Sequence, residues 1–181
     1  MEDRIWKKCV EFHGHECGGL MIGYRAALYA VRLLNLSLKE NGCISRDEQL
    51  VCISENDACG VDAIQVILGC SVGKGNLLFH MCGKQAFSIY DRETDRSVRL
   101  VLRPRPKGMK KEDTMKYFES CTDEEMFEVK ETTLNVPERA RIFRSIPCSR
   151  CGETAAENKM HLQGDEILCE DCYQAYDRFR I

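Results

Sequence analysis

The chain has 181 residues, 44% of them hydrophobic and 30% charged, which is the size and balance of one folded domain with a small addition. A formal net charge of −3 with dispersed lysines and arginines argues against a nucleic-acid-binding or anionic-membrane-binding protein. The N-terminal residues lack the apolar segment of a secretory signal, and Arg25 and Arg32 interrupt the most apolar stretch, residues 20–36. We therefore expect a cytoplasmic protein that has no membrane partner.

The hydrophobic pattern predicts three helices and four strands in the first hundred residues. Apolar residues at helical spacing favour helices at 3–12, 18–36 and 61–68, and runs rich in Val, Ile and Phe favour strands at 49–54, 76–82, 85–91 and 97–103. Gly83-Lys84 is expected to join the second and third strands as a hairpin, and residues 92–96 to join the third and fourth.

Surface elements and a change of composition follow the strands. Residues 110–121 and 122–130 read as short helices, the second opened by Thr122 as N-cap with Glu125 completing a capping box. Few large aliphatic residues follow position 148. The pattern predicts an α+β core domain at 1–136 with a mainly antiparallel sheet and packed helices, a linker at 137–147 and a small module at 148–181.

Twelve cysteines, in a chain that we expect to be cytoplasmic, point to metal ligation or thiol chemistry rather than to a disulfide framework. Cys148-x2-Cys151 and Cys169-x2-Cys172 are separated by 17 residues, a spacing typical of a zinc site with four thiolate ligands. A treble-clef or ribbon-like finger with a helix after the second pair is expected, and its role would be structural. The alternatives are two thioredoxin-like redox motifs or an unligated loop, and His161 is a spare ligand.

A second group of soft ligands lies in the stretch FHGHECGG at residues 12–19. His13, His15 and Cys17 can converge if the chain bends at its glycines, and imidazole with thiolate suits zinc, iron or nickel. The alternative is structural: His13 caps a helix and Cys17 is a small core residue.

The missing partner of that group is expected in ENDACGVDAIQ at residues 55–65. Cys59 precedes a predicted helix, where a thiolate is favoured, and polar residues surround it. Asn56, Asp57 and Asp62 are candidate ligand-binding residues, although the two aspartates can equally cap the helix. Lys74, in a Gly-rich loop that is not a P-loop, is a candidate for binding an anion, or simply part of a turn.

Several long stretches in this order resemble the E-subunit family of formylmethanofuran dehydrogenase. They are FHGHECGGLMIGYRAA, ENDACGVDAIQVILGCSVGKGNL, GKQAFSIYDRETDRSVRL and TDEEMFEVKE, and the final CSRCGE and LCEDC resemble a zinc-finger extension found in some members. The resemblance implies an intertwined homodimer of α+β domains with a site at His13, His15, Cys17 and Cys59. The family usually has proline where this chain has Gly18, which loosens the turn but removes no candidate ligand.

The resemblance leaves three functions open. The first is a metal-binding accessory or redox protein of a molybdenum or tungsten enzyme of one-carbon metabolism, which reduces carbon dioxide through catalytic metal-pterin machinery in other subunits. The second is a stand-alone enzyme with Cys17 or Cys59 as nucleophile or redox thiol and His15 as base or ligand. The third is a zinc-finger regulator that binds nucleic acid, which the acidic residues near the second cysteine pair disfavour. Zinc in the finger and a second metal of unknown identity are the expected cofactors.

Overall fold

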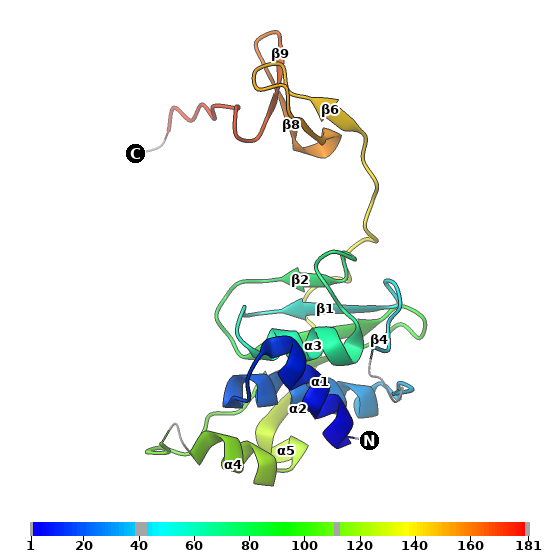
Figure 1. Ribbon diagram of the computed structural model, residues 1–181, viewed down its shortest axis with the longest axis vertical. Helices are drawn as coiled ribbons and strands as arrows, with labels where there is room; N and C mark the ends of the chain where they lie inside the picture. The colour runs from blue at the N-terminus through cyan, green and yellow to red at the C-terminus, as the bar shows by residue number, and fades with distance from the viewer. Residues whose placement is uncertain (1, 39–42, 111–112, 180–181) are drawn as a thin grey trace. The chain divides into compact units, whose positions relative to one another are not determined.

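The computed structural model describes residues 2–38, 43–110 and 113–179 and divides into two compact units, Met1–Ala140 and Arg141–Ile181. The first unit is an α+β domain built on a five-stranded sheet of order β2-β1-β3-β4-β5 (Figure 1). Its elements are α1 (Glu2–His13), α2 (Gly18–Leu33), β1 (Leu50–Ser54), α3 (Gly60–Leu68), β2 (Leu77–Phe79), β3 (Ala86–Asp91), β4 (Arg96–Leu102), α4 (Thr114–Ser120), α5 (Asp123–Met126) and β5 (Phe127–Lys130).

The expected fold class is confirmed, since all strand pairs of this sheet are antiparallel except β1 with β2. The hairpin expected across Gly83-Lys84 is wrong, because β1 lies between β2 and β3 in the sheet. β1, α3 and β2 instead form a parallel crossover unit, and Cys52 of β1 is in register with Leu77 of β2. This arrangement brings the start of α3 to the carboxyl end of β1.

The expected helix at 122–130 is also wrong beyond its first turn. Thr122 and Glu125 do form the predicted capping box, but the helix α5 ends at Met126 and residues 127–130 form the edge strand β5. Phe127 is 1% exposed and packs in the core, so burying it as a strand residue outweighs the helical tendency of the acidic segment before it. Of the neighbouring helix expected at 110–121, residues 111–112 lie outside the described part of the chain.

The main core lies between the helices and one face of the sheet. Leu50, Phe87, Ile89 and Leu100 from the strands pack with residues of α1, α2 and α3, as the ribbon shows for the helices in front of the sheet (Figure 1). Burying a large aliphatic or aromatic side chain stabilises the fold by about 2 kcal/mol. α2 is buried on most of its circumference, so its first turn is held firmly in place.

The chain that follows β5 packs on a second, smaller cluster of strand residues. Leu134 packs on Val51, Ile53 and Tyr90, and the Tyr90 hydroxyl donates to the Leu134 carbonyl at 2.7 Å. Further along, the Ala140 N–H donates to both carboxylate oxygens of Glu48 at 3.1 Å.

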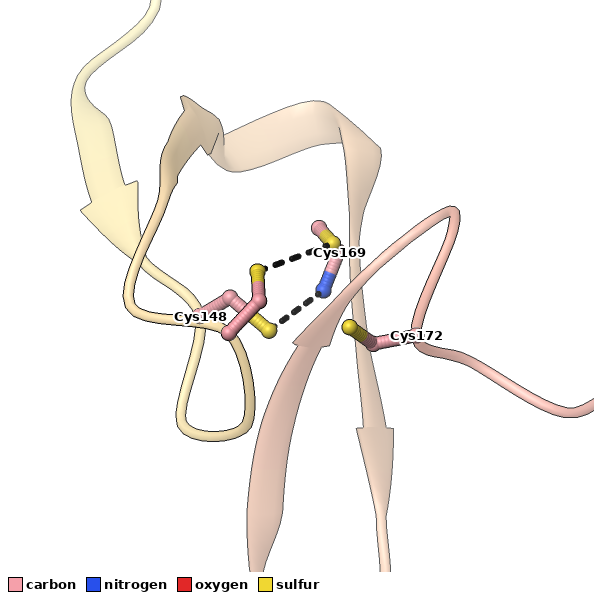
Figure 2. Close-up of side chains that lie close together, drawn as sticks. Cys148, Cys169 and Cys172 are labelled. Carbon is pink, nitrogen blue, oxygen red and sulfur yellow. Dashed lines mark hydrogen bonds between the residues drawn. The ribbon is translucent and has the colours of Figure 1, made fainter.

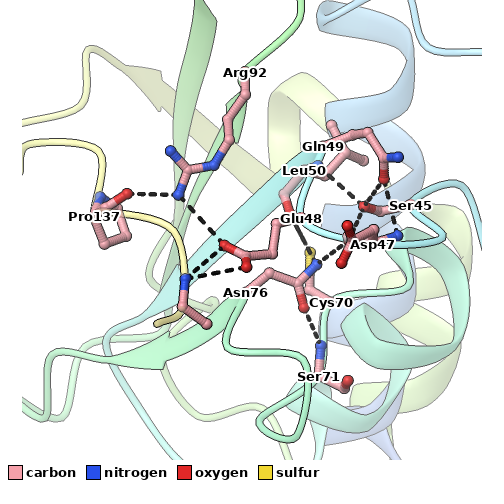
Figure 3. A network of polar contacts seen from close by, with 11 residues as sticks. Ser45, Asp47, Glu48, Gln49, Leu50, Cys70, Ser71, Asn76, Arg92 and Pro137 are labelled. Atoms are coloured by element: carbon pink, nitrogen blue, oxygen red, sulfur yellow. Dashed lines mark hydrogen bonds and ion pairs between the residues drawn. The ribbon is translucent and has the colours of Figure 1, made fainter. Parts of the chain in front are cut away.

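Arg92 strengthens this attachment. It donates to the Pro137 carbonyl at 2.5 Å and lies 3.9 Å from the Glu48 carboxylate (Figure 3). Residues 137–140, expected to be linker, are thus bound to the first unit.

The second unit consists of two hairpins. β6 (Ser145–Pro147) pairs with β7 (Thr154–Ala156), and β8 (Met160–Gln163) pairs with β9 (Glu166–Cys169) after the 3-10 turn η2 (Glu157–Lys159). β6 lies within the range expected to be linker. The helix expected after Cys172 is absent from residues 173–179, where the described chain is irregular. Among the described helices of the protein, none is long and apolar enough to cross a membrane.

Candidate functional site

The first candidate site forms where α1 ends and α2 begins. The Gly14 N–H donates to the Val10 carbonyl at 2.7 Å, and Gly14 has φ +91°, a conformation that glycine adopts without strain and that ends α1 directly after His13. The chain then turns, and Cys17 is the N-cap of α2, accepting the Leu20 N–H at 3.3 Å through its sulfur. The Cys17 sulfur therefore lies at the N-terminus of a helix, within hydrogen-bond distance of a backbone N–H of its first turn.

This turn brings three of the predicted ligands together. One ligand atom from each of His13, His15 and Cys17 lies within 4.8 Å of the others. The Cys17 sulfur lies 3.8 Å from His13 Nε2, and the two imidazole rings have their centroids 4.5 Å apart. Two nitrogens and one sulfur at these separations can share one ion in tetrahedral coordination, with the fourth position left for another ligand.

Asp62 of α3 determines which nitrogen of His13 faces this group. Its Oδ2 lies 2.7 Å from His13 Nδ1, and Gln65 Nε2 donates to the other carboxylate oxygen at 3.3 Å. A carboxylate at Nδ1 keeps the proton there and leaves the Nε2 lone pair directed at Cys17. Asp62, expected to contact a ligand or cap a helix, therefore lies behind His13.

Cys59 is not one of the three residues whose ligand atoms converge, but it lies beside Cys17 because α2 and α3 approach very closely. A Cβ added to Gly23 of α2 would lie 1.8 Å from the Gly60 carbonyl oxygen of α3, so only glycine fits at this crossing. One turn earlier, a Cβ on Gly19 would lie 3.4 Å from the Cys59 sulfur and 3.7 Å from the Cys17 sulfur. The two thiols thus lie next to each other beside Gly19.

The protonation state of Cys59 differs from the expectation. Burial of the thiol and its hydrogen bond with Cys17 raise the pKa of Cys59 above its ordinary value, although the residue begins a helix. Burial and the neighbouring thiol disfavour the thiolate form of Cys59, whereas a bound cation would favour it.

The other three predicted residues have different positions. Asp57 is exposed and lines a surface pocket beside Cys59. Asn56 is 3% exposed and is occupied by the fold, since it donates to the Lys84 carbonyl and accepts the Ala58 N–H. Its amide fixes the turn that carries Cys59 and does not face the ligand group.

Lys74 lies away from this group. Its ammonium donates to the carbonyls of Ser45 and Gly69, and Gly69 is the C-cap of α3, whereas Cys59 is at the N-terminal end of that helix. A helix of nine residues is about 13 Å long. Lys74 therefore stabilises the end of α3 and is not brought to the thiols.

The four C-terminal cysteines form the second candidate site. Their sulfurs all lie within 4.8 Å of one another, and the sulfurs of Cys151 and Cys169 are 3.9 Å apart. Sulfurs placed about 2.3 Å from a central zinc ion in a tetrahedron are about 3.8 Å apart, so the spacing fits zinc. Cys148, Cys169 and Cys172 point toward one another from the two hairpins (Figure 2).

The electrostatics of this group also fit a metal. Backbone N–H groups, first that of Cys151 and then that of Cys169, lower the pKa of Cys148 to about 6, whereas burial and the neighbouring thiols raise the pKa of Cys172 to about 12. Four neighbouring thiols cannot all ionise without a cation. The ring of His161 stacks on that of Tyr173 with the centroids 4.1 Å apart, and its Nε2 lies 2.7 Å from Glu170 Oε2. His161 is therefore not part of the four-cysteine group.

The sequence did not predict the close approach of Gly23 to Gly60 or the pairing of His13 with Asp62. Residues 13 and 62 are 49 positions apart, and no local pattern links them. A glycine inside the expected helix at 18–36 was the one available signal for Gly23, because a glycine in a helix often marks close packing.

Comparisons with known proteins agree with this architecture. Residues 12–149 match the family model described as FmdE, molybdenum formylmethanofuran dehydrogenase operon, and residues 141–178 match the prokaryotic dksA/traR C4-type zinc finger. A crystal structure of an FmdE-like protein, of the tungsten formylmethanofuran dehydrogenase type, from Syntrophus aciditrophicus matches with a TM-score of 0.68 and 25% identity. The match covers 94% of this chain and 91% of that one.

A curated relative was also found in an archaeon. It is a probable S-adenosyl-L-methionine-binding protein of Archaeoglobus fulgidus, 27% identical over 202 aligned residues. The alignment covers 96% of this chain and 53% of the relative, so the chain spans about half the length of that protein.

Proposed function

We propose, because the chain belongs to the FmdE family, that it is a metal-binding accessory protein of a molybdenum or tungsten enzyme of one-carbon metabolism. In this proposal it is not the catalytic metal-pterin subunit. The N-terminal group of His13, His15, Cys17 and Cys59 holds a metal ion, and the C-terminal finger holds zinc.

One observation supports the proposal above the others. The ligand atoms of His13, His15 and Cys17 lie within 4.8 Å of one another, and the Asp62 carboxylate already orients His13 for coordination through Nε2. A carboxylate behind a metal-binding histidine is usual in protein metal sites, because it fixes the ring and increases the basicity of the ligand nitrogen. A bound metal would supply Lewis acidity or, if redox-active, an electron-transfer centre.

The experiment is elemental analysis of the full chain purified without oxygen and without added chelator. We expect two metal equivalents per chain, one of them zinc in the finger. His15→Ala and Cys17→Ala should each lower the total to one equivalent, and Cys151→Ala should remove the zinc of the finger alone.

His80→Ala is the matched control for His15→Ala, since both histidines are exposed and His80 lies outside the ligand group. It should keep both equivalents. One equivalent in the unmodified protein, with no further loss in His15→Ala, would contradict the proposed N-terminal metal site.

A second function is supported by the position of the two thiols, which lie next to each other beside Gly19. Cys17 and Cys59 can form a redox-active pair or supply a nucleophile, with His15 as base, in a stand-alone enzyme acting on a small molecule. Titration with a thiol reagent separates the two functions: a metal centre protects both thiols until a chelator removes the ion, whereas a redox pair reacts at once.

The partners belong to the same proposal. An accessory protein should copurify with a larger molybdenum or tungsten enzyme from its native host. A homodimer should give a mass in solution of about twice the chain mass of 20.8 kDa by light scattering. A cytoplasmic location is in keeping with the twelve cysteines, all of them described and all free thiols.

A further inference from the structure

A pocket of about 400 Å³ opens beside the N-terminal thiols, and the metal proposal makes no use of it. His13 and Cys59 lie in its wall, so a molecule bound there would contact the proposed metal site directly. The volume lies within the range usual for small-molecule sites.

The remaining wall is largely apolar. Leu77 is 3% and Val61 is 7% exposed, whereas Phe79 and Val72 remain 43% and 63% exposed on the same pocket. Large apolar side chains that are open to water favour binding of a ligand with an apolar body, because the ligand removes their surface from water.

The charges around the pocket have one sign. Asp57 and Asp62 line it, and none of its lining residues, all of which the structure describes, is lysine or arginine. Asp62 is held by His13 and Gln65, which leaves the exposed Asp57 as the carboxylate available to a ligand. Two thiolates would balance a divalent metal, so a filled metal site leaves the pocket negative.

We propose that this pocket binds a small molecule with an apolar body and an amine group, the body against Phe79 and Val72 and the ammonium near Asp57. The inference names the class of small molecule that binds beside the proposed metal site. It rests on the proposed metal-binding function only for the fate of the bound molecule, and not for its binding. Anionic ligands are excluded by the same carboxylates that attract the amine.

The test uses three probes of similar shape and different charge: 2-phenylethylamine, 2-phenylethanol and 3-phenylpropionate. Binding to the full chain is followed by NMR chemical-shift changes at Phe79 and at the N-terminal end of α3. We expect the amine to bind most tightly and the carboxylate most weakly. Asp57→Asn should weaken binding of the amine roughly threefold and leave the affinity for the alcohol unchanged.

Phe79→Ala should weaken the binding of all three probes by about tenfold. Phe143→Ala is its matched control, because Phe143 is 37% exposed and lies outside the pocket. Asp95→Asn is the control for the charge change, since Asp95 is exposed and is not part of this wall. Tightest binding of the carboxylate, or binding that Phe79→Ala does not weaken, would overturn the proposal.

The same titrations on His15→Ala separate this proposal from the metal proposal. Amine binding that persists in His15→Ala supports the pocket whatever the metal analysis gives. Two metal equivalents in a protein that binds none of the probes would leave the metal site intact and refute the pocket.

Discussion

Asp62 Oδ2 and His13 Nδ1 lie 2.7 Å apart, although 49 residues separate them in the chain. The contact joins the last residue of α1 to the first turn of α3 and fixes the direction of the imidazole. It also links the position of a candidate ligand to the packing of two helices.

Removing this carboxylate should weaken the N-terminal metal site without unfolding the protein. Asp62→Ala is expected to lower metal affinity by roughly 10- to 100-fold, because His13 loses both its orientation and part of its basicity. Asp62→Asn retains an acceptor for the Nδ1 proton, so its metal affinity should lie between those of Asp62→Ala and the unmodified protein. The affinities can be measured by competition with a chromophoric chelator.

Asp57→Asn is the comparison variant, since it removes a carboxylate of the same pocket that does not touch His13. It should leave metal affinity nearly unchanged. An equal loss in both variants would mean that overall charge, rather than the contact with His13, governs affinity.

The close crossing of α2 and α3 predicts a large effect of a single methyl group. Gly23→Ala places a Cβ 1.8 Å from the Gly60 carbonyl oxygen, so the helices must separate. We expect the free energy of unfolding, measured in urea, to fall by about 3 kcal/mol. Gly73→Ala is the control, because a Cβ there meets nothing within 4 Å; a similar loss in both variants would refute the explanation.

Glu55 should contribute stability that depends on pH. It is 4% exposed and accepts two hydrogen bonds from Arg99, at 2.5 and 2.9 Å, which hold the pKa of Glu55 below its ordinary value. A lowered pKa in the folded state means that the stabilisation is present above the ordinary pKa of a glutamate and is lost as pH falls through the lowered value.

Glu55→Gln is therefore expected to cost about 3 kcal/mol at pH 7, and the difference from the unmodified protein should shrink as pH falls below 4.5. The comparison is Glu128→Gln, whose partner is Lys130 and whose side chain is 46% exposed. It should cost less than about 1 kcal/mol at any pH. Urea titrations across this pH range measure both, and a Glu55→Gln difference that grows toward low pH would contradict the reasoning.

Removing zinc should unfold the second unit and spare the first. Among residues 141–179 of that unit, only Cys148, Leu168 and Cys169 are buried, so the metal must provide much of the folding energy. Adding a strong chelator should collapse the backbone NMR signals of β6 to β9 into the narrow range of a disordered chain, while those of α2 and β3 stay in place. Persistence of the β8–β9 signals without zinc would show that the hairpins are stable by themselves.

The sequence predicted most elements of the first unit, because their hydrophobic patterns are strong and local. It failed for the pairing of β2 and for the strand β5. β2 is short, and the Gly83-Lys84 turn after it resembles a hairpin turn, while its pairing with β1 depends on the crossover through α3. β5 follows a correctly predicted capping box, and its strand conformation is decided by burial of Phe127 in the core.

The candidate ligands were predictable from residue type and spacing, whereas their supports were not. His13, His15, Cys17 and the four finger cysteines lie in short motifs. Asn56 and Lys74 were candidates for ligand contact, with a plain turn as the alternative for Lys74, and their side chains bond backbone carbonyls. A polar side chain in a turn satisfies the backbone as readily as it binds a ligand, and only the fold distinguishes the two.

The attachment of residues 137–140 determines where the two units can be separated. A cut after residue 136 would deprive the Glu48 carboxylate, in a residue 8% exposed, of the Ala140 N–H and would take the Pro137 carbonyl from Arg92. A cut after Ala140 keeps these bonds. We therefore expect an isolated first unit that ends at Ala140 to resist proteolysis, and one that ends at Val136 to be digested from its new terminus.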